Sequence, residues 1–528
     1  MGSARGHSLL FVAPTVAAVF AGCGGSNSSS DLISGSTGGA TSSTGGATSS
    51  TGGAAGATGG ASTGGSSAGA GGWPGSGGWP GGAAGQSAGG QSAAGAGGQG
   101  GAAGAAGLQA SLAAAGFDTL DGAFRFLDLS MCCATSCLGN NPTSPYGAFF
   151  VPDGPGQSAP NPNKGSDGLS ANFRLREDEA ILFIGKTPPK AKYFGFTPYL
   201  STRNDGTKTI TPFASLSETL NLDVIGVEGG SPFEAETVVI ASLDQGVDAR
   251  VRMALQAAGH PAESINSLVF DPTVSHPGLD ALGDTFGVLF RMAVLEDATK
   301  GDAYRANPPA KLFRLTPTTV ATPQPFPANA ARPKDLTDTE LGLTKAVDAL
   351  ESALVAKYAA FSHKSMITTE GTPDPAACIA GKDACAYDNR DTIYPATLPQ
   401  PLLDQGDFLV VYGVNHALTN KAHYANASVY GLEHLVGVAS VTSKDYEGSA
   451  VALLPGEANA QKLYAWKIAR DCAGEANCLE VATTDCPTGI PVGGKMSIAF
   501  RVYLEPGTHT AAAPATLVAD RVMHFTTK

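Results

Sequence analysis

The segment Met496–Leu504, with the sequence MSIAFRVYL, decides the fold class. Its large apolar side chains recur at every second position and alternate with Ser497, Ala499, Arg501 and Tyr503. This period of two is typical of a β-strand that buries one of its faces. Such a strand needs neighbouring strands and a layer packed on its apolar face. The segment therefore predicts an antiparallel sheet with a covering layer.

The surrounding chain supplies both the neighbours and the cover. We expect further strands at Phe408–Tyr412, Leu463–Ile468 and Val518–Phe525. The cover is predicted to be a helix that opens with a capping box formed by Thr337 and Glu340. One apolar stripe runs along this helix at helical spacing and comprises Leu343, Val347, Leu350, Leu354, Tyr358 and Phe361.

The first half of the folded region carries continuous apolar runs of strand length. The runs Ile181–Ile184, Val238–Ala241 and Phe286–Leu295 predict largely buried strands. After the second run, Asp244 is expected to cap a helix that ends at Gly259.

These patterns predict a strand-rich α+β protein with mainly antiparallel sheets and a few covering helices. Seven prolines between Asn307 and Pro333 favour an extended connection over a helix or a central strand. We place a boundary there, which gives two packed subdomains: an α+β subdomain at 108–330 and a helix plus antiparallel sheet at 331–528.

The start of the chain is typical of an exported protein. The apolar run Leu9–Phe20 is too short to span a bilayer and is followed by the small residues Ala21 and Gly22 before Cys23. The Ala-Gly-Cys ending resembles the lipobox of bacterial lipoproteins, although Phe20 stands where that family usually has leucine. The resemblance implies that residues 1–22 are a removed signal peptide and that Cys23 is lipidated. Gly24 follows Cys23 where lipoproteins retained in the inner membrane have aspartate, so the chain resembles the lipoproteins that are sorted to the outer membrane. The alternative is a plain secretory signal without lipidation.

Residues 23–107 form a tract rich in Gly, Ala, Ser and Thr, and no residue from Leu32 to Phe117 is charged. Such a composition cannot bury a core, so we expect a disordered tether with a reach of roughly 50 Å. Trp73 and Trp79 lie in two Gly-Gly-Trp-Pro-Gly units, which are either an aromatic recognition site or linker residues without a specific role.

Eight cysteines follow Cys23, and an even set in an exported protein indicates disulfide bonds rather than a thiolate metal site. Cys378 with Cys385, and two of the last three cysteines, are close enough to close small loops, whereas the vicinal Cys132 and Cys133 are expected to reach different partners. The disulfide candidates are Cys132, Cys133, Cys137, Cys378, Cys385, Cys472, Cys478 and Cys486.

Charge and missing motifs exclude several functions. The net charge is −13, which disfavours nucleic acid and anionic lipid as partners. The folded region contains no phosphate-binding glycine loop and no His-Glu-x-x-His helix, so nucleotide-dependent and zincin-type chemistry are not expected. Gly-x-Ser-x-Gly occurs only in the tether, where it lacks the strand–turn–helix frame that a serine nucleophile needs.

His416 and His423 are the candidate metal ligands. If residues 406–423 form a hairpin with its turn at Thr419 and Asn420, the two imidazoles face each other about 5 Å apart and could share a divalent metal ion. Asp404 is among the nearby residues available as a third ligand. The alternative is that both histidines are ordinary polar residues near a turn.

The second candidate site is the loop containing Asp388, Arg390 and Asp391, which follows Cys385. Its carboxylates suit Ca²⁺ or a paired acid and base in glycoside cleavage; the alternative is a solvated turn in which Arg390 bridges to a neighbouring carboxylate. Two functions therefore remain open at this stage. The first is a lipid-anchored protein, displayed at the outer membrane or cell surface, that binds an extracellular ligand. The second is an extracytoplasmic hydrolase that uses a metal ion or these carboxylates.

Overall fold

The computed structural model describes residues 100–128, 132–133, 136, 138–334, 338–398, 400–401, 403 and 406–528. The expected signal peptide, Cys23, most of the tether, Cys137, Thr337 and Asp404 lie outside the described residues. The described residues fall into one compact unit. The boundary near Ala331 stays a prediction.

The first half of the chain builds a 12-stranded sheet, counted over the described residues, with the strand order β10-β9-β4-β12-β1-β2-β11-β5-β6 and with β3, β7 and β8 at its margins. Its strands pair antiparallel except for β9 and β10, which are parallel. The bounds are β1 Phe117–Phe126, β2 Tyr146–Pro152, β3 Leu169–Ser170, β4 Ala180–Lys186, β5 Ala191–Asn204, β6 Thr209–Ile210, β7 Ala214–Ser215, β8 Leu220–Asn221, β9 Glu236–Ser242, β10 Ile265–Val269, β11 Thr285–Leu295 and β12 Ala310–Pro317.

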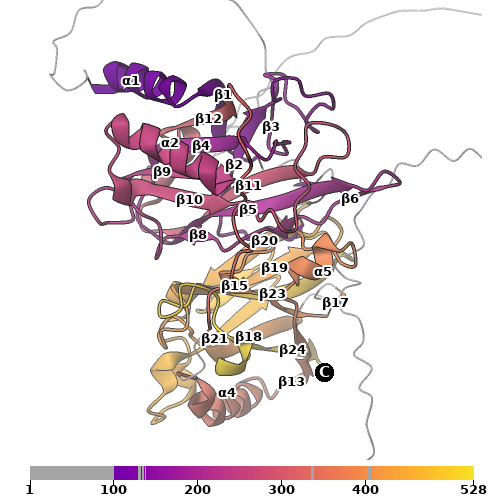
Figure 1. Ribbon diagram of the computed structural model, residues 1–528. Helices are drawn as coiled ribbons and strands as arrows, with labels where there is room; N and C mark the ends of the chain where they lie inside the picture. Colours follow the sequence, from indigo (N-terminus) through magenta and orange to yellow (C-terminus); the bar gives the residue numbers. More distant parts are fainter. Residues whose placement is uncertain are drawn as a thin grey trace, which may run out of the picture. The chain divides into compact units, whose positions relative to one another are not determined.

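Two helices cover one face of this sheet (Figure 1). Helix α1 spans Gly100–Ala114 and α2 spans Gln245–Ala257. Asp244 caps α2 as expected, because its carboxylate accepts a hydrogen bond from the Val247 amide at 2.8 Å. Along β4 and β9, one set of alternate residues packs on these helices and the other set packs on an aromatic core on the opposite face of the sheet. Because both faces are buried, the two strands have continuous apolar sequences. The shorter α3 spans Ala298–Ala306.

The second half of the chain forms two further sheets, with the orders β13-β24-β18-β21-β22 and β14-β16-β23-β19-β20, and β15 and β17 pair with β23 in the latter. The strand predicted from the MSIAFRVYL segment is β23. The bounds are β13 Phe361–Met366, β14 Thr368–Glu370, β15 Thr392–Ile393, β16 Pro395–Thr397, β17 Gln400–Pro401, β18 Phe408–Val414, β19 Tyr424–Gly431, β20 Val436–Thr442, β21 Leu463–Ala469, β22 Cys478–Glu480, β23 Lys495–Tyr503 and β24 Arg521–Thr527.

These two sheets pack face to face. Ile498 and Phe500 of β23 share a core with Leu409 and Val411 of β18. The other face of β18 packs on helix α4 (Thr344–Lys357). The short helices α5 (Pro375–Ile379) and α6 (Ser443–Tyr446) lie in connections. The expected strand-rich α+β class with mostly antiparallel sheets is confirmed.

The start of the covering helix was predicted wrongly. Helix α4 begins at Thr344, after a 3₁₀ turn over Leu341–Leu343, and its N-cap residue Leu343 makes no side-chain capping bond. Glu340 does not close a capping box, because its carboxylate binds His416 and Thr419 instead. The apolar stripe itself is confirmed from Leu343 to Leu354, whereas Phe361 already belongs to β13.

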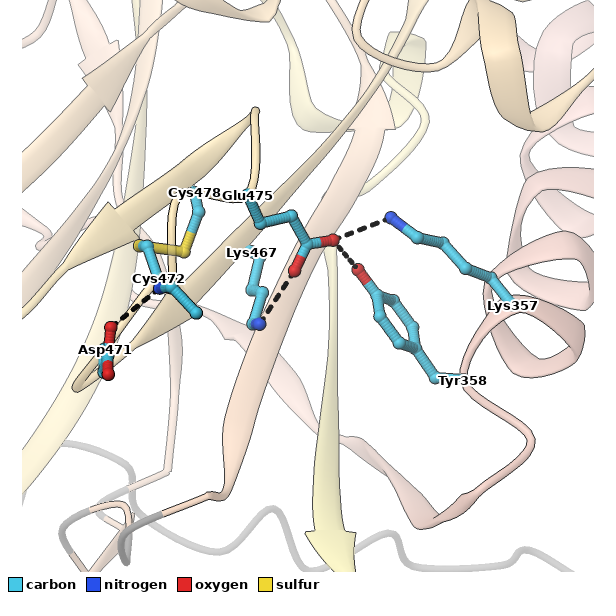
Figure 2. The surroundings of a disulfide bond; sticks show 8 residues. Lys357, Tyr358, Lys467, Asp471, Cys472, Glu475 and Cys478 are labelled. Carbon is cyan, nitrogen blue, oxygen red and sulfur yellow. Dashed lines mark hydrogen bonds and ion pairs between the residues drawn. A yellow bond between two sulfur atoms is a disulfide. The ribbon is translucent and has the colours of Figure 1, made fainter.

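Disulfides join Cys133 to Cys486, Cys378 to Cys385 and Cys472 to Cys478, and Cys132 is also disulfide-bonded. The two small loops expected from spacing are therefore present. Figure 2 shows that the loop closed by Cys472 and Cys478 presents Glu475 to three donors: Lys467, Lys357 and Tyr358. Although burial opposes the shift, the hydrogen bonds from the lysines lower the pKa of Glu475 to about 2.

Among the described residues, no helix combines the length and the apolar character that crossing a membrane would require.

Candidate functional site

The hairpin that would have placed His416 opposite His423 does not form. Strand β18 pairs with β21 and β24, and β19 pairs with β20 and β23, so the residues between β18 and β19 connect two different sheets. The pairing was predicted wrongly because two adjacent apolar strands pack face to face here instead of edge to edge. Across the described residues, no group of three or more His, Cys, Asp or Glu side chains is suited to hold a metal ion.

His416 is buried between two carboxylates. Its Nδ1 lies 2.9 Å from both oxygens of Glu340, and its Nε2 lies 3.3 Å from an oxygen of Asp520. Burial alone would lower the pKa of His416, but the two carboxylates raise it to about 10. The imidazolium is therefore held as a structural cation that joins the start of α4 to β24.

His423 belongs to a different cluster, centred on Asp223. The His423 Nε2 lies 2.9 Å from one Asp223 oxygen, and the His509 Nδ1 lies 3.3 Å from the other. Burial opposes the shift, but the hydrogen bond from His423 helps to lower the pKa of Asp223. Asp223 follows β8 in the first half of the chain, so this cluster links the two halves.

The loop with Asp388, Arg390 and Asp391 also lies between the two halves of the chain. We call this region the seam. It lies between β2, β5 and β11 of the first sheet and β15, β19 and β23 of the third sheet, which has the order β14-β16-β23-β19-β20. Asp388 accepts hydrogen bonds from the amide and hydroxyl of Ser215, both at 2.7 Å. Arg390 donates to Ser215 and lies 3.5 Å from Glu218. The expectation of a solvated turn is wrong for the two carboxylates, because both are buried.

Asp391 is the most perturbed carboxyl group of this loop. Its oxygens accept hydrogen bonds from the Tyr193 hydroxyl at 2.9 Å and from the Asn221 amide at 3.0 Å, and Arg332 lies 3.9 Å away. Burial raises the pKa of Asp391 to about 7. Asn221 also donates to the backbone oxygen of His509, so the loop and the Asp223 cluster share one polar network.

The seam further contains two buried arginines that sequence reasoning missed. Arg291 of β11 donates to the Tyr199 hydroxyl and to the Tyr387 carbonyl, both at 2.7 Å, and its guanidinium lies 5.4 Å from the Tyr146 ring centroid. For the second arginine, Arg501, the alternation of residues along β23 predicted a face shared with Tyr503. It did not predict that another sheet covers this face.

Arg501 of β23 approaches the same space from the other sheet. It donates to the Tyr430 hydroxyl and to the Gly139 carbonyl, and it lies 5.4 Å from the Tyr394 ring centroid. Tyr503, next to it on that face, stacks on Tyr424 with a centroid distance of 4.9 Å. Among the described residues, neither Arg291 nor Arg501 forms an ion pair with a carboxylate. The arrangement is therefore a positively charged centre lined by tyrosines.

Two shallow hollows lie elsewhere, beside α1. One has a volume of about 540 Å³ and is lined by Gln109, Asp118 and Leu120 among others, and the second measures about 330 Å³. Neither lining includes a residue proposed from the sequence as catalytic or metal-binding.

No protein family matches the chain, and no curated protein matches it. Among solved structures, an uncharacterized protein from Burkholderia cenocepacia is 14% identical and aligns over 79% of this chain and 86% of its own, with a TM-score of 0.36. A protein from Vibrio parahaemolyticus is 10% identical and aligns over 73% of this chain and 89% of its own, with a TM-score of 0.33. Likeness at this level carries no argument about function.

Proposed function

We propose that this protein is an exported lipoprotein that displays a disulfide-stapled domain for binding an extracellular ligand. Three disulfide bonds with both partners described are typical of proteins that fold in an oxidising compartment outside the cytoplasm. The lipobox-like Ala21-Gly22-Cys23 supports a lipid anchor at Cys23, on an outer membrane or cell surface. The uncharged tract that follows supports a spacer between anchor and domain.

The observation that carries ligand binding is the pair of buried arginines in the seam. Burying a guanidinium group without a carboxylate partner is costly, and an anionic group of a ligand would offset that cost. A binding role also accounts for the other charged groups better than hydrolysis does. Asp388, Asp391 and His416 all hydrogen-bond to internal partners, so none of these three candidates is a free acid or base.

Anchoring is tested by expressing the full chain in a diderm bacterium that is fed an alkyne-labelled fatty acid. We expect label on the wild-type protein and none on Cys23→Ser. Protease added to intact cells should release the folded domain by cleavage in the tract before Leu108. An unlabelled wild-type chain recovered in the soluble periplasm would contradict the anchor.

Ligand binding is tested separately, with the purified chain and a panel of charged and neutral small molecules in a thermal-shift assay. A binding protein should show saturable stabilisation by one chemical class, which disappears when an arginine of the seam is replaced. Turnover of generic esters, glycosides or phosphoesters that is lost in Asp391→Asn would favour the hydrolase instead.

A further inference from the structure

We propose that Arg291 and Arg501 bind a phosphate or sulfate group, so that the ligand of the seam carries such a dianionic group. This inference rests on the proposed function as a ligand-binding protein and names the chemical class of the ligand.

The positive charges of the two guanidinium groups are incompletely compensated. Arg291 and Arg501 are 3% and 6% exposed, and their hydrogen-bond acceptors among the described residues are all neutral. Those acceptors are two tyrosine hydroxyls, a threonine hydroxyl and two backbone carbonyls, in Tyr199, Tyr430, Thr197, Tyr387 and Gly139. Neutral oxygens stabilise a buried guanidinium less than a charged oxygen does.

The two guanidinium groups approach the seam from different sheets. The Arg291 guanidinium lies 5.4 Å from the Tyr146 ring centroid, and the Arg501 guanidinium lies 5.4 Å from the Tyr394 ring centroid. The sheets that carry the two arginines meet where Tyr503 of β23 lies 4.6 Å from Tyr193 of β5, measured between ring centroids. Tyr146 comes from the first sheet, Tyr503 from the third, and Tyr394 from the connection between β15 and β16. A guanidinium group carries five N–H donors. In the described part of the chain, Arg291 makes three hydrogen bonds to neutral oxygens and Arg501 makes two. Two such groups, one from each sheet, suit the tetrahedral oxygens of phosphate or sulfate.

One buried carboxylate lies close enough to act on this centre. Asp388 interacts electrostatically with Arg291, and it therefore offsets part of the positive charge. Both Asp388 oxygens are hydrogen-bonded to Ser215, and Arg390 acts on Asp388 more strongly than Arg291 does. Arg501 has no comparable carboxylate among the described residues. The centre therefore keeps a net positive charge, which favours a dianion over a monocarboxylate.

Partly exposed tyrosines lie beside the two buried arginines. Tyr146, Tyr387 and Tyr394 are only half-buried, although the arginines behind them are buried. These tyrosines therefore lie at the rim of the centre. A terminal oxyanion group would enter past these rings.

The test uses the exported chain carrying Cys23→Ser, purified without phosphate or sulfate. Binding of ³²P-phosphate is measured by equilibrium dialysis, and thermal stability is measured in phosphate, sulfate, acetate and chloride at constant ionic strength. We expect saturable binding of phosphate, competition by sulfate, and stabilisation that acetate and chloride do not reproduce. Arg501→Lys should weaken binding at least about tenfold, because it loses the forked pair of donors.

Matched variants separate binding from folding. Arg521→Lys serves as the control, because Arg521 pairs with Asp348 and Glu351 beside α4, and we expect it to bind phosphate like the wild type. Tyr146→Phe keeps the ring beside Arg291 and removes a hydroxyl that accepts a hydrogen bond from the Asn141 amide at 2.8 Å; the variant should fold and bind several-fold more weakly. If Arg501→Lys does not fold, Tyr146→Phe and wild-type dialysis decide the outcome.

Absence of saturable phosphate and sulfate binding by the wild type would overturn the proposal, as would unchanged binding in folded Arg501→Lys. Preference for acetate over both dianions would overturn the ligand class while leaving ligand binding intact. Failure of fatty-acid labelling at Cys23, in contrast, would affect only the anchor.

Discussion

The Asp391 carboxyl group is buried between Tyr193 and Asn221, and this burial raises its pKa to about 7. Its ordinary pKa is 3.8, so the folded state holds a proton that the unfolded state releases between these two values. The stability that this proton contributes is fully present below pH 3.8 and is lost as the pH rises through 7. The slope is at most about 1.4 kcal/mol per pH unit.

Asp391→Asn should therefore flatten the fall in the free energy of unfolding between about pH 4 and pH 7. Guanidinium denaturation at several pH values in this window measures the slope. Asp302→Asn is the control, because Asp302 is largely exposed. A slope in the Asp391→Asn protein equal to that of the wild type would contradict the assignment of this proton to Asp391.

His416 makes the opposite kind of contribution, as a buried cation whose pKa is raised from 6.5 to about 10. Its stabilisation is fully present below pH 6.5 and is lost as the pH rises through 10. His416→Gln should cost about 3–5 kcal/mol at pH 7, because Glu340 and Asp520 would stay buried without a cation between them.

The free energy of unfolding of the wild type should fall between pH 6.5 and about pH 10, and His416→Gln should lose this fall. His434→Gln, at a partly exposed site beside Glu433, should change the stability by less than about 0.5 kcal/mol. Equal effects of the two substitutions would show that His416 does not hold this buried charge.

For single residues, the sequence indicated which side chains carry charge but not which distant residues they contact. The loop with Asp388 and Asp391 was singled out correctly as a concentration of charge, but its burial depends on Ser215 and Tyr193, which lie far away in the chain. His423 was singled out for a metal ion shared with His416, whereas its partner is Asp223. Nothing local to these residues encodes such partners.

At the scale of elements, the loop closed by Cys472 and Cys478 is stabilised by an acid-sensitive contact (Figure 2). The Glu475 pKa is about 2 instead of 4.5, so its contribution is present above pH 4.5 and is lost as the pH falls towards 2. Glu475→Gln should cost on the order of 1 kcal/mol at pH 7, because the partly exposed site screens the ion pairs with Lys467 and Lys357.

Acid denaturation of Glu475→Gln and of the exposed control Glu480→Gln measures this contact. The Glu475→Gln protein should lose part of the decrease between pH 4.5 and about pH 2, while the control should keep it. If both variants follow the wild type, the contact in Figure 2 contributes nothing to stability in solution.

Strand β23 shows what periodicity can and cannot predict. The alternation of MSIAFRVYL located the strand and the face that enters the core with β18, because the two faces of a strand follow from its geometry alone. The other face, with Arg501 and Tyr503, is buried too, although its composition is that of a half-exposed surface. Helix α4 was found by its apolar stripe, but its start was not, because Glu340 binds His416 instead of the helix terminus.

At the scale of the whole molecule, the Cys133–Cys486 disulfide joins residues that are 353 positions apart. In the chain-entropy model a disulfide that closes a longer loop restricts the unfolded chain more. Cys133→Ser/Cys486→Ser should therefore destabilise the protein by about 2–5 kcal/mol, and by more than Cys472→Ser/Cys478→Ser, whose loop spans only 6 positions.

Denaturant unfolding of the two double variants, with the remaining disulfides verified by mass spectrometry, provides the comparison. An equal or larger loss for the short loop would mean that local strain or contacts such as those of Glu475 dominate over the entropy of the unfolded chain.

The sequence by itself determined the strand-rich α+β class, the buried strands, the stripe of α4, the Cys378–Cys385 loop and the presence of a second short loop among the last three cysteines, because each depends on a periodicity or a spacing within a few residues. Only the tertiary structure decided that the polar face of β23 meets β5 and β11, that Asp391 is buried, and that Arg291 and Arg501 converge in the seam. The physical reason is that a strand encodes two unlike faces, whereas the identity of the surface that each face meets depends on contacts between distant parts of the chain.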